Sequence, residues 1–99
     1  MNLIVHDEAT AELTAAAEWY EHERVGLGDE LLAEAAGALK AIAQSPAAWS
    51  FVMRSKVVRR YVFERFPYIA YFVVRADHVL VLAFGHTSRK PGYWRHRLK

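Results

Sequence analysis

The spacing of apolar residues changes from a helical period to a strand period near residue 50, and this change restricts the chain to a two-part fold. In the first half, apolar residues recur at the spacing of one helix face over residues 7–24 and again over residues 27–45. We predict a helix over each range, with Asp7 as the N-cap of the first. The side chains expected in the core are Leu13, Tyr20, Leu31, Leu39 and Ile42.

The second half contains three runs rich in β-branched and aromatic residues, over 57–64, 68–75 and 78–86. The breaks between them are short, which predicts antiparallel strands in a meander. Residues 2–6 read as a further short strand. The predicted order is β-α-α-β-β-β, an α+β fold in which an antiparallel helical hairpin covers one face of a mostly antiparallel sheet. With 99 residues the chain is expected to form one domain, residues 1–99, that leaves the other face of the sheet open.

Charge is divided between the two halves of the chain. Residues 1–50 carry a net charge of −7 and residues 51–99 a net charge of +9. Acidic residues of the first helix, among them Glu8, Glu12 and Glu18, are predicted to lie mostly away from its buried face. A positive field of this size attracts a nucleic-acid backbone or an acidic protein partner, and charge alone does not distinguish the two.

Composition excludes several classes of protein. The chain has no cysteine, which rules out disulfides and thiolate metal sites, and its histidines lack the spacing of a metal-binding motif. No metal and no cofactor are therefore predicted. The longest apolar runs, 68–74 and 79–84, are too short to cross a bilayer, so no membrane partner is expected. The N-terminus does not resemble a signal peptide, which favours a cytoplasmic location.

Basic residues of the second half are the main candidates for binding a target or nucleic acid. Strand alternation places Arg60, Val62 and Glu64 on one side of the first meander strand, and this more polar set is expected on the open face of the sheet. The alternative is that these are solvated strand charges and that Trp94 belongs to the core. The candidate binding residues are Arg54, Lys56, Arg59, Arg60, Arg89, Lys90, Tyr93, Trp94, Arg95 and Arg97.

Some of these residues have the chemistry needed for RNA cleavage without a metal. Glu64 is a candidate base for the ribose 2′-hydroxyl, and His86 a candidate acid for the leaving oxygen. Arg60 and Arg89 would stabilise the charged phosphorane, and Tyr93 would stack on a base. The alternative is that His86 is a strand-end histidine bonded to backbone and that Tyr93 closes the edge of the core.

Taken in order along the chain, several short segments resemble the RelE/ParE superfamily of type II toxin–antitoxin toxins, especially its ParE-like plasmid-stabilisation branch. These segments are Trp19-Tyr20-Glu21, Gly26-Leu27-Gly28-Asp29, Ile42 with Pro46, Arg59-Arg60, Phe66-Pro67-Tyr68, and Val79–Phe84 followed by His86, Arg89, Pro91 and Trp94. The predicted β-α-α-β-β-β order is also the fold of this superfamily.

The resemblance implies a toxin that a cognate antitoxin neutralises by direct binding, and we expect an acidic antitoxin segment on the basic half. ParE-like members inhibit DNA gyrase, whereas RelE-like members cleave mRNA on the ribosome with Lys, Arg and Tyr side chains. Lys56, Arg60, Arg89 and Tyr93 would take these places here. The Phe66–Tyr68 turn and the C-terminal segment are closer to the ParE-like pattern, which favours gyrase inhibition. The alternatives are a RelE-like endoribonuclease and a non-toxic remnant that still binds its antitoxin.

Overall fold

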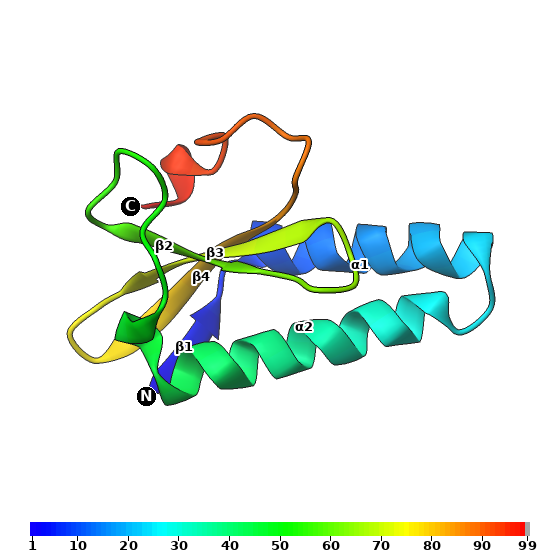
Figure 1. The fold of residues 1–99 in the computed structure, drawn as a ribbon, viewed down its shortest axis with the longest axis horizontal. Coiled ribbons are helices and arrows are strands. Elements are labelled where there is room, and N and C mark those ends of the chain that lie inside the picture. Colours follow the sequence, from blue (N-terminus) through cyan, green and yellow to red (C-terminus); the bar gives the residue numbers. More distant parts are fainter. Residues whose placement is uncertain (99) are drawn as a thin grey trace.

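The computed structural model describes residues 1–98 and shows a four-stranded sheet with a pair of helices packed on one face (Figure 1). The elements are β1 (Asn2–Val5), α1 (Asp7–Glu23), α2 (Leu27–Gln44), β2 (Val58–Val62), β3 (Tyr68–Val74) and β4 (His78–His86), with 3-10 turns at Pro46–Ala48 and Arg95–Leu98. The strand order is β1-β4-β3-β2, with β1 parallel to β4 and the other pairs antiparallel. The predicted α+β architecture is confirmed, although β2 is shorter than expected. Across residues 1–98, neither helix is long and apolar enough to cross a membrane.

The turn between the helices depends on one carboxylate and two glycines. Glu21 accepts hydrogen bonds from the backbone N–H groups of Gly26, at 2.9 Å, and Gly28, at 3.0 Å. Gly26 has a φ of +90°, a left-handed conformation that favours glycine. A Cβ on Gly28 would lie 2.5 Å from the carbonyl oxygen of Ala17, so α1 and α2 approach closely only because this residue has no side chain.

The first helix is capped by a different residue from the one predicted. His6, rather than Asp7, is the N-cap, and its Nδ1 accepts a hydrogen bond from the Glu8 N–H at 3.1 Å. Asp7 and Glu8 lie in the first turn, where a negative charge favours the helix dipole.

The helix-side core lies between the two helices and one face of the sheet. Leu31 and Ile42 are fully buried there, as predicted, against Phe72 and Phe84 of the sheet. The other predicted core side chains are only partly buried around this cluster; they are Leu13, Tyr20 and Leu39.

The opposite face of the sheet is partly covered, which corrects the expectation that the chain leaves this face open. The C-terminal segment, residues 87–98, folds back over this face, where Trp94 is buried against Tyr71, Val73 and Leu82. Figure 1 shows this segment on the side of the sheet away from the helices, next to the loop that precedes β2. The chain thus supplies a partial third layer from its own C-terminal segment, which we call the tail.

Two tryptophans test whether the tail contributes to stability. Trp94→Ala removes a side chain that is 2 % exposed and is expected to cost about 3–5 kcal/mol of the free energy of unfolding. Trp19→Ala removes one that is 59 % exposed and should cost less than about 1 kcal/mol. Urea denaturation of both variants measures the difference. Equal midpoints would contradict the third layer.

Candidate functional site

One edge of β4 extends past its neighbouring strand, and side chains satisfy the exposed backbone there. β1 ends at Val5, opposite Val81, whereas β4 continues to His86. A β-bulge between Val81 and Ala83 makes Leu82 the extra residue of β4. Beyond it, the Phe84 N–H donates to Glu12 of α1 at 3.0 Å, and the Leu82 carbonyl accepts from Arg97 of the tail at 3.0 Å.

Glu12 and Arg97 also bind each other and so join the helix to the tail. The guanidinium of Arg97 is 6 % exposed and makes a bidentate pair with Glu12, with N···O distances of 2.9 and 3.1 Å. Burial alone lowers the pKa of Arg97, but its hydrogen bonds to Glu12 and the nearby Glu8 charge raise that pKa above its usual value. Arg97 therefore keeps its positive charge in this pair. Glu12 thus faces inward, which corrects the expectation that it lies off the buried face.

Further contacts fix the tail at both ends. Arg89 lies 3.5 Å from Glu12, and His96 lies 3.0 Å from Glu8, whose pKa this hydrogen bond lowers. At the far end, Arg75 donates to the carbonyl of Leu98 at 2.8 Å. The acidic first helix and the basic tail thus neutralise one another in part within a single chain.

Five basic side chains of the second half line an open cavity of about 600 Å³, which we call the basic cavity. Its floor is the tail-side face of the sheet, with Arg60, Ile69 and Tyr71, as alternation predicted for Arg60. Its walls are the loop before β2 and the tail. The basic side chains that line it are Arg54, Arg60, Arg89, Lys90 and Arg95. All the charged side chains among its lining residues are positive, so it is suited to an anionic group.

Local backbone structure sets the position of two of these arginines. Arg54 has a φ of +64°, which is uncommon for a residue other than glycine, and Ser55 holds the turn by accepting from the N–H groups of Val57 and Val58. Gly92 has a φ of +90°, and a Cβ there would collide with the guanidinium of Arg95. Gly92 therefore allows Arg95 to fold against the tail backbone.

His86 lies in a different place from Arg60. It lines a groove formed by α1 and the end of the sheet, with Trp19, Tyr68 and Arg89. Its ring packs edge-on against Tyr68 at 5.3 Å, and its Nδ1 accepts from the backbone N–H of Ser88 at 3.0 Å. This is the backbone-bonded, strand-end arrangement that the sequence left open as the alternative. Arg89 lines both this groove and the basic cavity.

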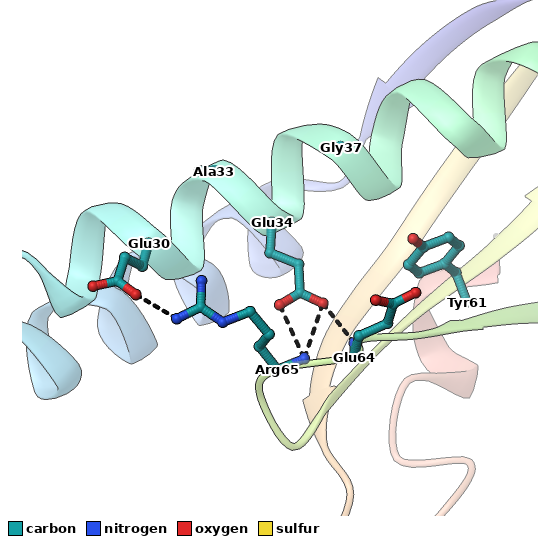
Figure 2. A pocket seen from close by; sticks show the side chains of 7 residues that line it. All are labelled: Glu30, Ala33, Glu34, Gly37, Tyr61, Glu64 and Arg65. Carbon is teal, nitrogen blue, oxygen red and sulfur yellow. Dashed lines mark hydrogen bonds and ion pairs between the residues drawn. The ribbon is translucent and has the colours of Figure 1, made fainter.

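Glu64 lies in a third place, at the turn that follows β2. Figure 2 shows it beside Glu34 and Arg65 in a pocket between α2 and the end of β2. Glu34 accepts from the backbone N–H groups of Glu64 and Arg65, and Arg65 pairs with Glu30. Glu64 therefore lies on the α2 side of β2, near Glu34 and Tyr61. This corrects the expectation that it shares a face with Arg60, because β2 ends at Val62 and strand alternation does not extend to Glu64. Within residues 1–98, Glu64, His86 and Arg60 line separate cavities.

Tyr93 packs beneath the wall of the basic cavity. Its hydroxyl is buried against Gly85, where a Cβ would lie 2.7 Å from the hydroxyl oxygen, and makes no hydrogen bond within residues 1–98. Arg89 stacks on its ring at 3.7 Å. Burial, followed by the nearby Glu12 carboxylate, raises the pKa of Tyr93 well above the usual tyrosine range. Tyr93 is a neutral packing surface for Arg89 in this arrangement.

The remaining candidate residues divide between interior and surface. Trp94 and Arg97 are interior, as described above. Arg59 donates to the carbonyls of Ala47 and Trp49, at 3.2 and 2.6 Å, and so holds the loop before β2. Lys56 is exposed on that loop, outside the lining of the basic cavity.

Sequence reasoning missed Glu12 as the residue that organises the tail. Its spacing on α1 could have indicated that it faces the core. Glu12 lies three residues after Ala9 and four before Ala16, and both alanines are buried. A carboxylate in a row of core positions requires a buried donor. Met53 and Tyr71, which line the basic cavity, were also not singled out.

A comparison with protein families identifies the family of this chain. Residues 3–91 match the sequence profile of the family described as "ParE toxin of type II toxin-antitoxin system, parDE". The chain belongs to this family. The resemblance seen in the sequence is thereby confirmed, and with it the assignment to the toxins of type II toxin–antitoxin systems. A comparison with curated protein sequences gave no significant match.

A solved structure supports the ParE-type fold. A chain described as "Chromosomal ParDE TA system from P. aeruginosa" superposes with a TM-score of 0.73 at 21 % identity, covering 87 % of this chain and 95 % of that one. The family match ends at residue 91. The buried part of the tail, with Trp94 and Arg97, lies beyond it.

The burial of Tyr93 makes stability depend on pH in alkaline solution. An unfolded tyrosine ionises near pH 10, whereas the folded state keeps this proton, so unfolding becomes more favourable as pH rises above about 10. Tyr93→Phe should reduce that loss by up to about 1.4 kcal/mol per pH unit and leave stability at pH 7 nearly unchanged. Urea midpoints at pH 8, 10 and 11 test this. An identical alkaline loss in both proteins would contradict the assignment.

Proposed function

We propose that this chain is a growth-inhibiting toxin that acts by contact with another protein, with DNA gyrase as its target, and that a cognate antitoxin neutralises it by direct binding. The observation that carries the proposal is the separation of the candidate catalytic groups, namely the base, the acid and one charge-stabilising arginine. Glu64, His86 and Arg60 line three different cavities. A general base and a general acid must both come within hydrogen-bond reach of the reacting group, and this arrangement favours a contact mechanism.

A RelE-like endoribonuclease is the second candidate. The observation that favours it is the set of cations in the basic cavity, where Arg60, Arg89 and Lys90 line one space. Such a cluster is suited to stabilising the charge of a phosphorane. Proton transfer would then have to involve groups of the ribosome or a rearranged His86.

The antitoxin is proposed to place an acidic segment in the basic cavity. Four of its lining arginines offer planar donors for carboxylates, and Met53, Ile69 and Tyr71 offer apolar contact between them. Met53 is 83 % exposed, so the loop that carries it presents a large apolar side chain to a partner. This combination fits an acidic segment that also contains apolar anchors.

Induced expression in a sensitive bacterial host distinguishes the two mechanisms. We expect growth arrest with a DNA-damage response and intact mRNA, and we expect His86→Ala to retain toxicity. If the chain is instead a nuclease, translation stops early, mRNA is cut, and His86→Ala loses on the order of 10²–10³ in rate. Full growth of cells expressing soluble wild-type protein would identify the non-toxic remnant and refute the proposal.

The proposed antitoxin site predicts a salt-dependent association rate. Charge complementarity mainly accelerates encounter, and salt screens it, so the rate should fall as ionic strength rises. The measurement is stopped-flow mixing with the cognate antitoxin at 50 and 500 mM salt. Exchanging Arg54, Arg60 and Arg95 for Gln should flatten this dependence, whereas Arg24→Gln, at the far end of the helical hairpin, should leave it unchanged. A wild-type rate indifferent to salt would remove the electrostatic part of the proposal.

A further inference from the structure

The geometry points to a latch: the Glu12–Arg97 pair holds the tail in place as one wall of the basic cavity, so that two residues outside the cavity lining set its affinity for an acidic peptide. This inference rests on the proposed antitoxin site. It concerns the tail beyond residue 91, where the family match ends. Glu12 and Arg97 are positioning residues here, because the cations that line the cavity are other side chains.

One carboxylate, that of Glu12, contacts several groups at once. Glu12 accepts from the Phe84 N–H, pairs with Arg97 and lies 3.5 Å from Arg89. Of these, Arg89 is itself a wall residue of the basic cavity, and its guanidinium lies 3.7 Å from the centre of the Tyr93 ring. Losing the Glu12 charge therefore releases a contact of Arg89 as well as the anchor of the tail.

Arg97 anchors the tail to β4 of the sheet. Its Nη1 donates to the Leu82 carbonyl at the β-bulge, and its backbone N–H donates to the Trp94 carbonyl at 2.9 Å. The Arg95 N–H donates to Gly92 at 3.0 Å, so Arg95 lies in the same short turn. The position of Arg95 on the cavity wall thus follows from the anchoring of Arg97.

The opposite wall, the loop before β2, touches the tail through Val52 but is also held by hydrogen bonds of its own. The loop before β2 is held by Ser55 and by a hydrogen bond from the Val52 N–H to the Val58 carbonyl at 2.8 Å. Arg60 lies on β2 itself. Breaking the latch should therefore displace Arg89, Lys90 and Arg95 while Arg54 and Arg60 remain in place, and binding should weaken rather than vanish.

The test measures tail order and anion binding in the same purified variants. Glu12→Gln keeps an acceptor for Phe84 but loses the charge, and Arg97→Lys keeps the charge but loses the bidentate geometry and is the safer variant for folding. Hydrogen exchange of residues 93–98 should become faster on the order of tenfold in both. Affinity for a fluorescein-labelled deca-glutamate peptide at 50 mM salt should fall on the order of tenfold.

Two control variants distinguish loss of tail position from a simple loss of charge. Glu18→Gln removes one exposed charge from the same helix and should change neither readout. Arg60→Gln should weaken peptide binding and leave tail exchange unchanged, because Arg60 lies on the sheet floor. The Glu12 and Arg97 variants could show faster hydrogen exchange in residues 93–98 and still bind the peptide as tightly as the wild type. In that case the proposed positioning role of the Glu12–Arg97 pair is wrong.

Failure of this inference is distinguishable from failure of the proposed function. A wild-type protein that binds an oligo-dT 12-mer but not the glutamate peptide would overturn the assignment of the cavity to an acidic peptide. Growth inhibition and the DNA-damage response are measured in cells and do not depend on this peptide. If the wild-type protein is toxic and the Glu12 and Arg97 variants bind the peptide with unchanged affinity, the latch is overturned and the proposed function is not.

Discussion

The fold depends on how the unpaired edge of β4 is satisfied. β1 is too short to cover β4 beyond Val81, and buried backbone groups need hydrogen-bond partners. The chain meets this need with Glu12 from α1 and Arg97 from the tail, and the two then neutralise each other. A buried ion pair adds little stability by itself, but removing one partner strands the other charge at a cost of about 3–5 kcal/mol. The pair therefore specifies where the tail must lie.

Ion pairs within the chain account for part of the division of charge between the two halves of the sequence. An acidic first half and a basic second half suggested a strongly positive surface for a partner. In the fold, Glu8 and Glu12 face Arg89, His96 and Arg97, while Glu30 pairs with Arg24 and Arg65. Among the cations that form no ion pair within residues 1–98, Arg54, Arg60, Lys90 and Arg95 lie together in the basic cavity.

Periodicity in the sequence was sufficient to predict the helices, the strands and their order, because each element buries one regular face. Leu31 and Ile42 followed from that pattern, and so did the placement of Arg60 on the face away from the helices. The tail could not be predicted in this way. It has no regular period, its anchor is an arginine, and burial of Arg97 becomes intelligible only once Glu12 is known to face inward. Local patterns indicate elements, whereas a buried ion pair between residues far apart in sequence is a property of the tertiary fold.

The same reasoning explains why individual site residues were harder to predict than the family. The segments that resemble the ParE-like branch include structural ones, such as Glu21 with Gly26 and Gly28, which close the helical hairpin. Fold recognition needs only such segments. A site requires convergence in space, and the chain separates Glu64 and His86 from Arg60 although all three lie within one meander. What does converge is a set of cations from three segments, namely the loop before β2, β2 itself and the tail, of which α1 contacts the tail through Glu12. Under the proposed function, a surface of that kind would bind through many weak contacts, and its affinity would then depend on the position of the tail more than on any single side chain.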